Sequence, residues 1–397
     1  MNKINRLWLL SLLLIFFSKT NLAKDIVRLF ANKESPKVQF AIGNIQKALE
    51  NKAQKSFYHP IAQFKNFDDM DYKILLLDIN NKAATDILKN VDITEIDELK
   101  NEGFIIKKTG EGNRTTLIIG NSYAGVMYGG LEAAEIIQTR GIEFIENQFQ
   151  NPYMKVRGTK FNIPLDVRTP TYTEPCDAAQ NNMAEMWNFD FWKDYIDNLA
   201  RYRYNTISLW NMHPFPSMVK VPEYPDVALD DVRKSTVEWE ENYPLNGWDF
   251  DAPEIVNNYE VIKKITIEEK IEFWRKVMAY GKDRNVQFFI LTWNIFDYGV
   301  EGKYGITDKL ENQVTTDYFR QSIKQMVLTY PDLAGIGLTT GENMYDYTTT
   351  QKEEWAFATY GQGVLDAIKE QPDREIYLIH RQHQTQAKEI SKIFKDV

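Results

Sequence analysis

The stretch "DLAGIGLTTGENMYDY", Asp332–Tyr347, carries the pattern that decides the fold. It begins with the apolar run Leu333–Leu338, which has the length and composition of a buried strand. The run then breaks at Thr-Thr-Gly and is followed by Glu342, Asn343 and Tyr345. Polar residues that directly follow a buried strand are typical of a parallel sheet whose strand ends form a site.

The same succession of strand and helix recurs along residues 151–397, which predicts a parallel sheet with helical crossovers. Both a doubly wound sheet and a β/α barrel give this pattern. No glycine-rich phosphate loop follows the first strand, and polar and aromatic residues gather after the strand ends, which favours a TIM-type (β/α) barrel. The expected strands are 155–163, 205–210, 287–293, 333–338 and 375–379, and the expected helices are 189–202, 267–284, 316–329, 350–370 and 385–395.

The expected barrel is short of strands. A complete barrel of this type has eight strands in about 250 residues. Residues 151–397 yield five, because 211–265 has the pattern of one very long loop, and the sequence stops at Val397 inside an expected helix. We therefore expect a TIM-barrel catalytic domain that is incomplete at its C-terminus; the alternative is that some strands escape the pattern.

Residues 24–150 differ in composition and contain no tryptophan. They predict a small α+β accessory domain whose last helix begins after Ser122 as its N-cap. The expected helices are 38–49 and 122–138, and the expected strands are 72–78, 103–109 and 115–120, the last two joined by a glycine-containing turn.

The first 23 residues have the pattern of a secretory signal peptide. Lys3 and Arg6 precede the apolar run Leu7–Phe17, and Ala23 supplies a small residue at the cleavage point. The alternative is an uncleaved membrane anchor. We expect an exported protein, periplasmic or extracellular, with no membrane contact after cleavage, because no later segment is long and apolar enough to span a bilayer.

Charge and cysteine content exclude further classes. Cleavage of the signal would change the formal charge from −9 to −12, because it removes three positive charges. Such an acidic protein is a poor partner for nucleic acid, which requires basic patches. Cys176 is the one cysteine, so no internal disulfide can form, and no local signature supports a catalytic thiol.

The histidines do not indicate a metal site. They stand at positions 59, 213, 380 and 383, which is not the spacing of a zinc cluster. His380 and His383 lie on one extended segment, where their side chains are expected to point to opposite faces. A Gly-x-Ser-x-Gly motif is also absent from the sequence. We therefore expect neither a metal nor another cofactor.

Candidate substrate-binding residues follow each of the five expected strands. Amide, imidazole, guanidinium and carboxylate groups at successive strand ends suit a polyhydroxylated and acidic substrate, so the expected partner is a carbohydrate. The residues are Asn162 and Arg168; Trp210, Asn211 and His213; Trp293, Asn294 and Asp297; Asn343 and Tyr345; and His380 and Arg381.

Tryptophan is concentrated between residues 187 and 293. Trp192 and Trp274 occur at helical spacing and are expected in the core. The others that end strands or lie in the long loop can offer their faces to sugar rings, with burial in the core as the alternative for each. These are Trp210, Trp293, Trp239 and Trp248.

Glu342 has the features of a general acid. Glycoside cleavage uses two carboxyl groups, one of which protonates the departing oxygen. Glu342 suits this role because it leaves a buried strand on a glycine, close to Tyr345. The alternative is a glutamate that starts a helix or forms a salt bridge. Asp297 is the nearest candidate for the second carboxyl group, which is otherwise expected on a later strand.

Three stretches carry a resemblance to a known family: "TTLIIGNSYAGVMYGGLEAAEII" (115–137), "KVRGTKFNI" (155–163) and "GIGLTTGENM" (335–344). They resemble exported bacterial glycoside hydrolases related to the α-glucuronidases of xylan breakdown, and more distantly the β-N-acetylhexosaminidases. The resemblance implies an α+β domain before a catalytic barrel, Glu342 as the acid, Arg381 as a substrate-binding arginine and a base on later strands. Hexosaminidases have an aspartate directly before the acid, where this chain has Gly341.

Together these features predict a glycoside hydrolase that acts on a plant or algal polysaccharide or its oligosaccharides, in the manner of an α-glucuronidase, with Glu342 as general acid. One alternative is a non-catalytic carbohydrate-binding protein or a degenerate hydrolase fragment. A second is a hexosaminidase-like glycosidase, although Gly341 counts against it.

Overall fold

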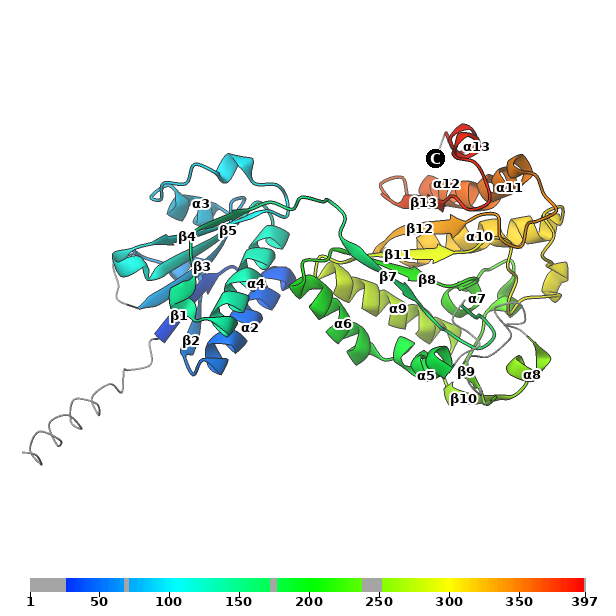
Figure 1. The fold of residues 1–397 in the computed structure, drawn as a ribbon, viewed down its shortest axis with the longest axis horizontal. Helices are drawn as coiled ribbons and strands as arrows, with labels where there is room; N and C mark the ends of the chain where they lie inside the picture. The colour runs from blue at the N-terminus through cyan, green and yellow to red at the C-terminus, as the bar shows by residue number, and fades with distance from the viewer. Residues whose placement is uncertain (1–25, 68–70, 172–176, 238–251, 396–397) are drawn as a thin grey trace, which may run out of the picture. The chain divides into compact units, whose positions relative to one another are not determined.

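The computed structural model describes residues 26–67, 71–171, 177–237 and 252–395. The chain divides into two compact units, Met1–Lys155 and Val156–Val397, each with its own sheet (Figure 1). The expected signal peptide, Cys176, Trp239 and Trp248 lie outside the described residues. None of the described helices is both long and apolar enough to span a bilayer.

The first unit is built on a six-stranded sheet in the order β2-β1-β3-β5-β4-β6. Four strands are parallel, and β4 pairs antiparallel with β5 and β6. α2 and α4 pack together on one face, and Ala84 and Leu88 of α3 cover the other (Figure 1). The elements are β1 (Ile26–Ala31), α2 (Pro36–Asn51), β2 (Lys55–Pro60), β3 (Tyr72–Asp78), α3 (Lys82–Leu88), β4 (Phe104–Thr109), β5 (Thr115–Gly120), α4 (Tyr123–Thr139) and β6 (Gln148–Gln150).

Helix α4 follows the sequence prediction closely. Ser122 is its N-cap and accepts hydrogen bonds from two backbone N–H groups of the first turn. Small residues line the side that faces α2: a Cβ on Gly130 would lie 2.7 Å from Cβ of Ala41. This glycine therefore allows the two helices to approach more closely than larger residues would permit.

The second unit is built on a five-stranded parallel sheet in the order β7-β8-β11-β12-β13. Its strands follow one another in chain order, as in a β/α barrel, and the order does not reverse as in a doubly wound sheet. The predicted fold class, an α+β domain followed by a barrel-like β/α unit, is confirmed. Within the described residues β7 and β13 are the edge strands. The strands are β7 (Gly158–Asn162), β8 (Thr206–Trp210), β11 (Gln287–Thr292), β12 (Leu333–Thr339) and β13 (Tyr377–Arg381).

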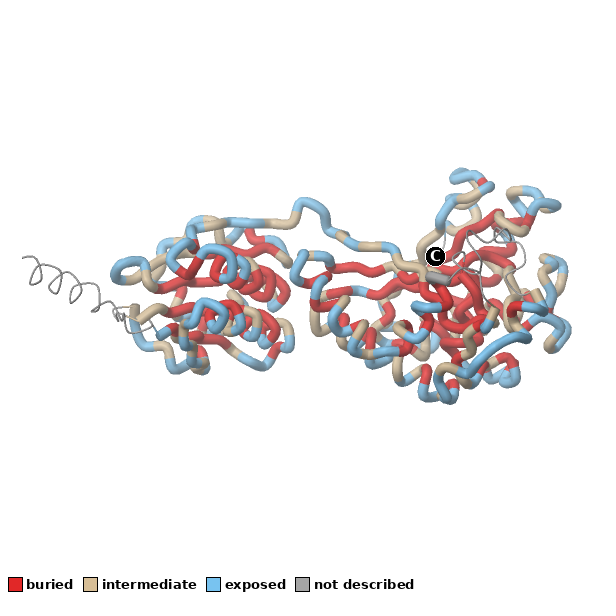
Figure 2. Tube along the Cα trace, turned by 60° about the horizontal axis from the view of Figure 1, so that its bottom comes forward, coloured by how far each residue is buried: buried red, intermediate tan, exposed pale blue. Residues whose placement is uncertain are grey.

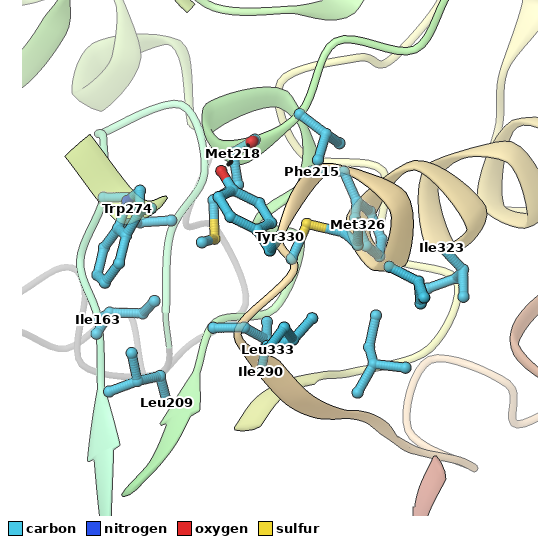
Figure 3. Close-up of a cluster of buried hydrophobic side chains, with 14 of the residues drawn as sticks. Ile163, Leu209, Phe215, Met218, Trp274, Ile290, Ile323, Met326, Tyr330 and Leu333 are labelled. Atoms are coloured by element: carbon cyan, nitrogen blue, oxygen red, sulfur yellow. Dashed lines mark hydrogen bonds between the residues drawn. The ribbon is translucent and has the colours of Figure 1, made fainter. Parts of the chain in front are cut away.

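Helices cover one face of this sheet and form the main core with it. Alternate strand residues such as Leu209, Ile290 and Leu338 lie in this core together with Trp192 and Trp274. Figure 3 shows Leu209, Ile290 and Trp274 in it, and Figure 2 shows that the middle of the unit is largely buried. Both tryptophans are wholly buried, so their prediction as core residues is confirmed. The helices of the unit are α5 (Asp177–Met186), α6 (Phe189–Arg201), α7 (Phe215–Met218), α8 (Pro253–Val256), α9 (Ile267–Lys282), α10 (Gln313–Thr329), α11 (Thr349–Ala356), α12 (Gln362–Glu370) and α13 (Ala387–Ile393).

The long segment predicted as a loop, 211–265, contains regular structure. Besides α7 and α8 it forms an antiparallel pair, β9 (Val232–Ser235) and β10 (Tyr259–Lys263). The prediction of one very long loop is therefore wrong. These short strands escaped the prediction because they lack the long apolar runs that mark the strands of the parallel sheet.

Two further boundaries differ from the prediction. The helix expected over 350–370 is divided into α11 and α12 by a π-helical turn, Phe357–Gly361. The last strand was expected over 375–379, but β13 extends over Tyr377–Arg381. His380 and Arg381 are therefore part of the strand and point to opposite faces of the sheet.

Candidate active site

The inner face of the parallel sheet, opposite the helices, carries polar side chains at its carboxyl end. Phe161 of β7 packs against aromatic residues of α6 on the helical side. Because side chains alternate along a strand, Lys160 and Asn162 point to the inner side, as does Trp210, which pairs in register with Asn162. Arg381 of β13 lies on the same side, next to the core-facing His380.

Trp210 is the centre of a cationic cluster on this inner face. Nζ of Lys160 lies 5.2 Å from its ring centre, and the guanidinium carbon of Arg381 lies 5.9 Å away. Trp293 meets the same ring edge-on at 5.3 Å between centres. Burial lowers the pKa of Lys160, and the positive charge of Arg381 lowers it further. Two cations that repel each other therefore share one aromatic ring.

The cluster also shows that the sheet is strongly curved. Trp210 is on β8 and Arg381 is on β13, and two strands separate them in the sheet. Neighbouring strands lie about 4.8 Å apart, so a flat sheet would separate the two backbones by about 14 Å. Curvature towards the inner face, together with the long arginine side chain, explains the contact and agrees with a barrel-like sheet.

Glu342 lies in the turn that follows β12, with its side chain 19% exposed. Its Oε1 is 3.0 Å from Nε2 of His383, in the turn that follows β13. Gly341 brings these turns together: its φ is +101°, and a Cβ there would lie 2.1 Å from the carbonyl oxygen of His383. Asn343 also adopts a left-handed backbone, with φ of +56°, a conformation that asparagine tolerates well.

Three predicted substrate-binding residues, Asn211, Asn294 and His213, are instead wholly buried and hydrogen-bonded to other parts of the protein. The amide of Asn211 donates to the carbonyl oxygens of Ile163 and Thr169. The amide of Asn294 donates to the carbonyl of Thr339 and accepts from the N–H of Ile295. Their prediction as substrate ligands is corrected, since their polar atoms already hold the strand ends together. The third residue is His213.

His213 is held between two elements. Its Nδ1 lies 2.7 Å from the carbonyl oxygen of Tyr298, and its Nε2 lies 3.1 Å from the hydroxyl of Tyr318. Nδ1 therefore carries the proton and donates, and Nε2 accepts from the tyrosine. Burial lowers the pKa of His213 to about 4, although the bond to the Tyr298 carbonyl acts in the opposite direction. A neutral, fully bonded and buried imidazole is not available to a substrate.

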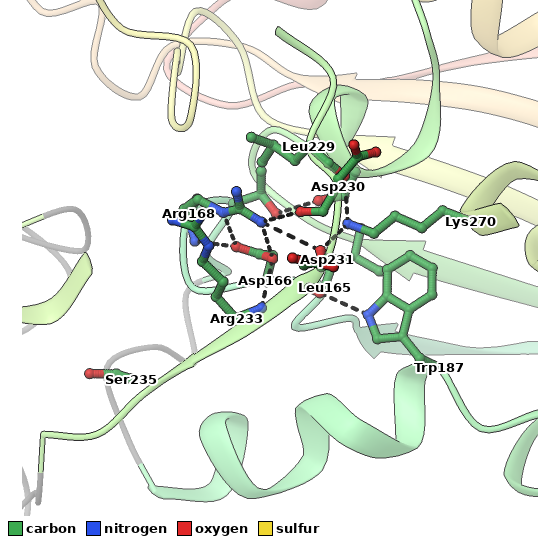
Figure 4. A network of polar contacts seen from close by, with 12 residues as sticks. Leu165, Asp166, Arg168, Trp187, Leu229, Asp230, Asp231, Arg233, Ser235 and Lys270 are labelled. Atoms are coloured by element: carbon green, nitrogen blue, oxygen red, sulfur yellow. Dashed lines mark hydrogen bonds and ion pairs between the residues drawn. The ribbon is translucent and has the colours of Figure 1, made fainter. Parts of the chain in front are cut away.

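Arg168 also has a structural role in place of the predicted one. It forms two hydrogen bonds with the wholly buried carboxylate of Asp166, at 2.7 and 2.8 Å, and donates to the carbonyl of Asp230 (Figure 4). Lys270 of α9 donates to the carbonyls of Leu229 and Asp231 in the same network, and burial lowers its pKa to about 8. The network docks the 229–233 segment against the turn after β7.

The remaining predicted residues occupy different surroundings. His380 faces the helices, where its Nε2 lies 2.7 Å from Oε2 of Glu353. The prediction that His380 contacts the substrate directly is therefore corrected as well. Asp297 is half-buried in the turn after β11, and Tyr345 is 62% exposed beyond β12. The structure thus brings together Asn162, Trp210, Trp293 and Arg381 in one cluster, and Glu342 with His383 in adjoining turns.

Two residues of this face were not among the predicted ones. Lys160 lies within β7, and the sequence argument considered only residues that follow strands. His383 was considered only as a metal ligand; it and His380 contact different glutamates, Glu342 and Glu353. Among the described residues no group of three or more His, Cys, Asp or Glu side chains is placed to hold a metal ion.

Comparison with known proteins finds similarity to glycoside hydrolases. The profile of the Glycosyl hydrolase family 67 N-terminus matches residues 17–132. A search of curated proteins found no match.

Solved structures match nearly the whole chain in fold. A GH138 enzyme targeting pectin rhamnogalacturonan II has a TM-score of 0.66 and 19% identity, over 93% of this chain and 46% of its own. A mutant Streptomyces plicatus β-hexosaminidase in complex with GlcNAc has a TM-score of 0.52 and 10% identity, over 93% of this chain and 67% of its own. The GH20 β-N-acetylhexosaminidase from Streptomyces coelicolor A3(2) has a TM-score of 0.50 and 10% identity, over 93% and 68%.

At these identities the structural matches show the fold alone, and the chain spans less than half the length of the GH138 enzyme. The match of the N-terminal profile and the shared fold together confirm the predicted resemblance: the chain resembles glycoside hydrolases of the α-glucuronidase family.

Proposed function

We propose that the protein is an exported glycoside hydrolase that cleaves an acidic sugar from a plant or algal polysaccharide or its oligosaccharides, in the manner of an α-glucuronidase. Glu342 is its general acid. The family 67 N-terminal match and the fold shared with a GH138 enzyme support the class of reaction. The GH138 enzyme is described as targeting a pectin, which supports an acidic plant polysaccharide as the substrate class.

The cationic cluster around Trp210 is the observation that carries the proposal. Lys160 and Arg381 both approach one indole ring, on the face of the sheet where strand ends form barrel active sites. Two cations held close together repel each other, so a bound anion stabilises them. A sugar carboxylate supplies that anion, and the flat indole offers an apolar surface for a sugar ring.

Glu342 is placed to move the proton. It is partly exposed in the turn after β12. This strand is the neighbour of β13, which carries Arg381. In the proposed step its carboxyl group protonates the glycosidic oxygen as the bond to the anomeric carbon breaks. Asp297, half-buried after β11, is the candidate within this chain for the second carboxyl group.

Gly341 argues against the hexosaminidase alternative. Acetamido-assisted cleavage places an aspartate directly before the acid, as the hexosaminidase pattern requires. Here any side chain at residue 341 would collide with the backbone of His383. The turn geometry therefore excludes that residue without a rearrangement of both turns.

The test is hydrolysis of aryl α-glucuronide and α-galacturonide by the full-length protein, with the matching neutral glucoside as comparison. We expect turnover of a uronide, and Glu342→Gln should lower kcat at least about 100-fold. Glu354→Gln, an exposed glutamate on α11, is the matched control and should leave kcat unchanged. Turnover that is insensitive to Glu342→Gln would overturn the proposal, and binding of uronides without any turnover would identify a carbohydrate-binding protein instead.

A further inference from the structure

The two turns that carry Glu342 and His383 are tied together by a buried polar network beneath them. At its centre is Glu353 of α11, whose side chain is fully buried. Its Oε1 accepts a hydrogen bond from the hydroxyl of Thr340 at 3.3 Å, and its Oε2 lies 2.7 Å from Nε2 of His380. A buried carboxylate is costly unless it is well bonded, so this arrangement resists change.

The network continues across to the second turn. The hydroxyls of Thr340 and Thr385 lie 3.2 Å apart. Since Thr340 donates its one hydroxyl hydrogen to Glu353, the hydrogen between the two threonines belongs to Thr385. The bonds therefore run in one direction, from Thr385 through Thr340 to Glu353, and link β13's turn to β12's turn.

Both ends of this link are next to the contact between Glu342 and His383. Thr340 is two residues before Glu342, and Thr385 is two residues after His383. Gly341, between Thr340 and Glu342, packs closely against the carbonyl oxygen of His383. A shift of either threonine would consequently change the distance of 3.0 Å between Glu342 and His383.

We infer that Glu353 is a positioning residue for the acid: it fixes the two turns so that Nε2 of His383 remains 3.0 Å from Oε1 of Glu342. Glu353 touches no substrate, because it is buried on the helical side of the sheet beside His380. Its effect on hydrolysis rests on the proposed function of Glu342, whereas its effect on the turns does not.

The variants separate positioning from general damage. Glu353→Ala removes both bonds, and Glu353→Gln keeps the volume and the acceptor for Thr340 but brings an amide N–H towards His380. Thr385→Val is nearly isosteric and breaks only the bond between the turns. The matched control is Glu354→Ala, an exposed glutamate next to Glu353 on the same helix. If Glu353→Ala does not fold, Thr385→Val alone still tests whether the bond between the two turns positions His383.

Two readouts are needed. In protein labelled with ¹⁵N-histidine, we expect the side-chain ¹⁵N resonances of His383, assigned with His383→Asn, to shift in Glu353→Ala and Thr385→Val and to stay unchanged in Glu354→Ala. In the uronide assay we expect kcat to fall about 10- to 100-fold in Glu353→Ala, with partial recovery in Glu353→Gln and little change in KM.

The outcomes distinguish this inference from the proposed function. If His383 resonances and kcat are the same in Glu353→Ala, Thr385→Val and Glu354→Ala, the inference is overturned while Glu342 can still be the acid. If Glu342→Gln leaves hydrolysis intact, the proposed function fails, and the histidine spectra alone then decide whether Glu353 positions the turns. A parallel rise in KM and loss of stability would indicate a purely structural glutamate and would also overturn the inference.

Discussion

Gly341 shows how much the candidate site depends on a single residue. Its backbone is left-handed, which costs any other residue about 1 kcal/mol or more, and a Cβ would in addition overlap the His383 carbonyl. The sequence offered only the pattern Thr-Thr-Gly-Glu. The reason for the glycine is a contact with a turn more than forty residues away, which no local pattern can contain.

We predict that Gly341→Ala destabilises the protein by about 2–4 kcal/mol, since it adds steric overlap to backbone strain. Gly302→Ala is the matched control: its φ is +71°, but no atom lies within 4 Å of the added Cβ. Its cost should be about 1 kcal/mol, the strain alone. Urea unfolding of both variants measures the difference, and equal losses would show that the His383 contact contributes nothing.

Buried polar residues were the main source of error at the scale of single residues. Asn211 and Asn294 are polar residues that come just after a strand, which is also where substrate-binding residues of barrel enzymes stand. Their amides are consumed by backbone carbonyls of neighbouring strands, as in the bond from Asn211 to Ile163. Hydrogen-bond satisfaction is decided by tertiary structure, so the sequence could nominate these side chains but could not tell ligand from support.

At the scale of elements, the helices and strands with strong periodicity were predicted well. β3 and β5 have the predicted bounds, and α6 and α10 agree to within a few residues, because each buries a regular apolar face. β10 and β2 were missed because most of their residues are half-buried or exposed, which leaves no apolar run to recognise.

β13 begins two residues later than predicted. Arg374, which precedes it, donates to the carbonyl oxygens of Tyr330 and Leu333. Pairing with β12 starts at Tyr377 and continues to Arg381. A shift of two residues leaves each side chain on the same face of the sheet. It makes Arg381 part of the strand, paired with Thr339, with its side chain on the inner face.

His213 joins the turn after β8 to the turn after β11 and to α10, and this junction is expected to depend on pH. Its pKa in the folded protein is about 4, below the ordinary histidine value of about 6.5. The unfolded chain therefore binds more protons between these values, so stability is full above pH 6.5 and falls as the pH drops towards 4. The loss amounts to about 3 kcal/mol.

The measurement is the free energy of unfolding from pH 7 to 4 for the wild type and His213→Gln. Glutamine can still donate to the Tyr298 carbonyl and accept from Tyr318, but it does not titrate. We expect a shallower pH slope for the variant in this window. Parallel curves would show that acid sensitivity arises elsewhere in the molecule.

At the scale of the whole molecule, the curved sheet brings residues from its first and last strands onto one indole ring. Neither the curvature nor the partnership of Lys160 with Arg381 is visible in the sequence, because the two residues are far apart in the chain and only the folded sheet brings them together. The sequence predicted the parallel sheet and its helical crossovers. The contact between residues of its first and last strands required the structure.

We predict that Lys160→Met and Arg381→Met each raise KM for a uronide about 10-fold or more, because a charge-assisted bond to the substrate carboxylate is lost. KM for the neutral glucoside should change little, and added salt should narrow the difference between the two substrates for the wild type. Lys89→Met is the control: this lysine is exposed and pairs with Asp86 in the first unit. An equal rise in KM for both substrates would contradict a role in recognising the acid group.

The π-helical turn Phe357–Gly361 has a consequence for the phase of the helix around it. A π-bulge adds one residue to a regular helix, which rotates everything after it by about 100°. Glu353, before the turn, contacts His380 of β13, and Tyr360, within the turn, donates to the carbonyl of Trp293 in the turn after β11. One continuous helical segment thus contacts the ends of two strands, β11 and β13, and a change of register at the π-helical turn would move Tyr360 relative to Glu353.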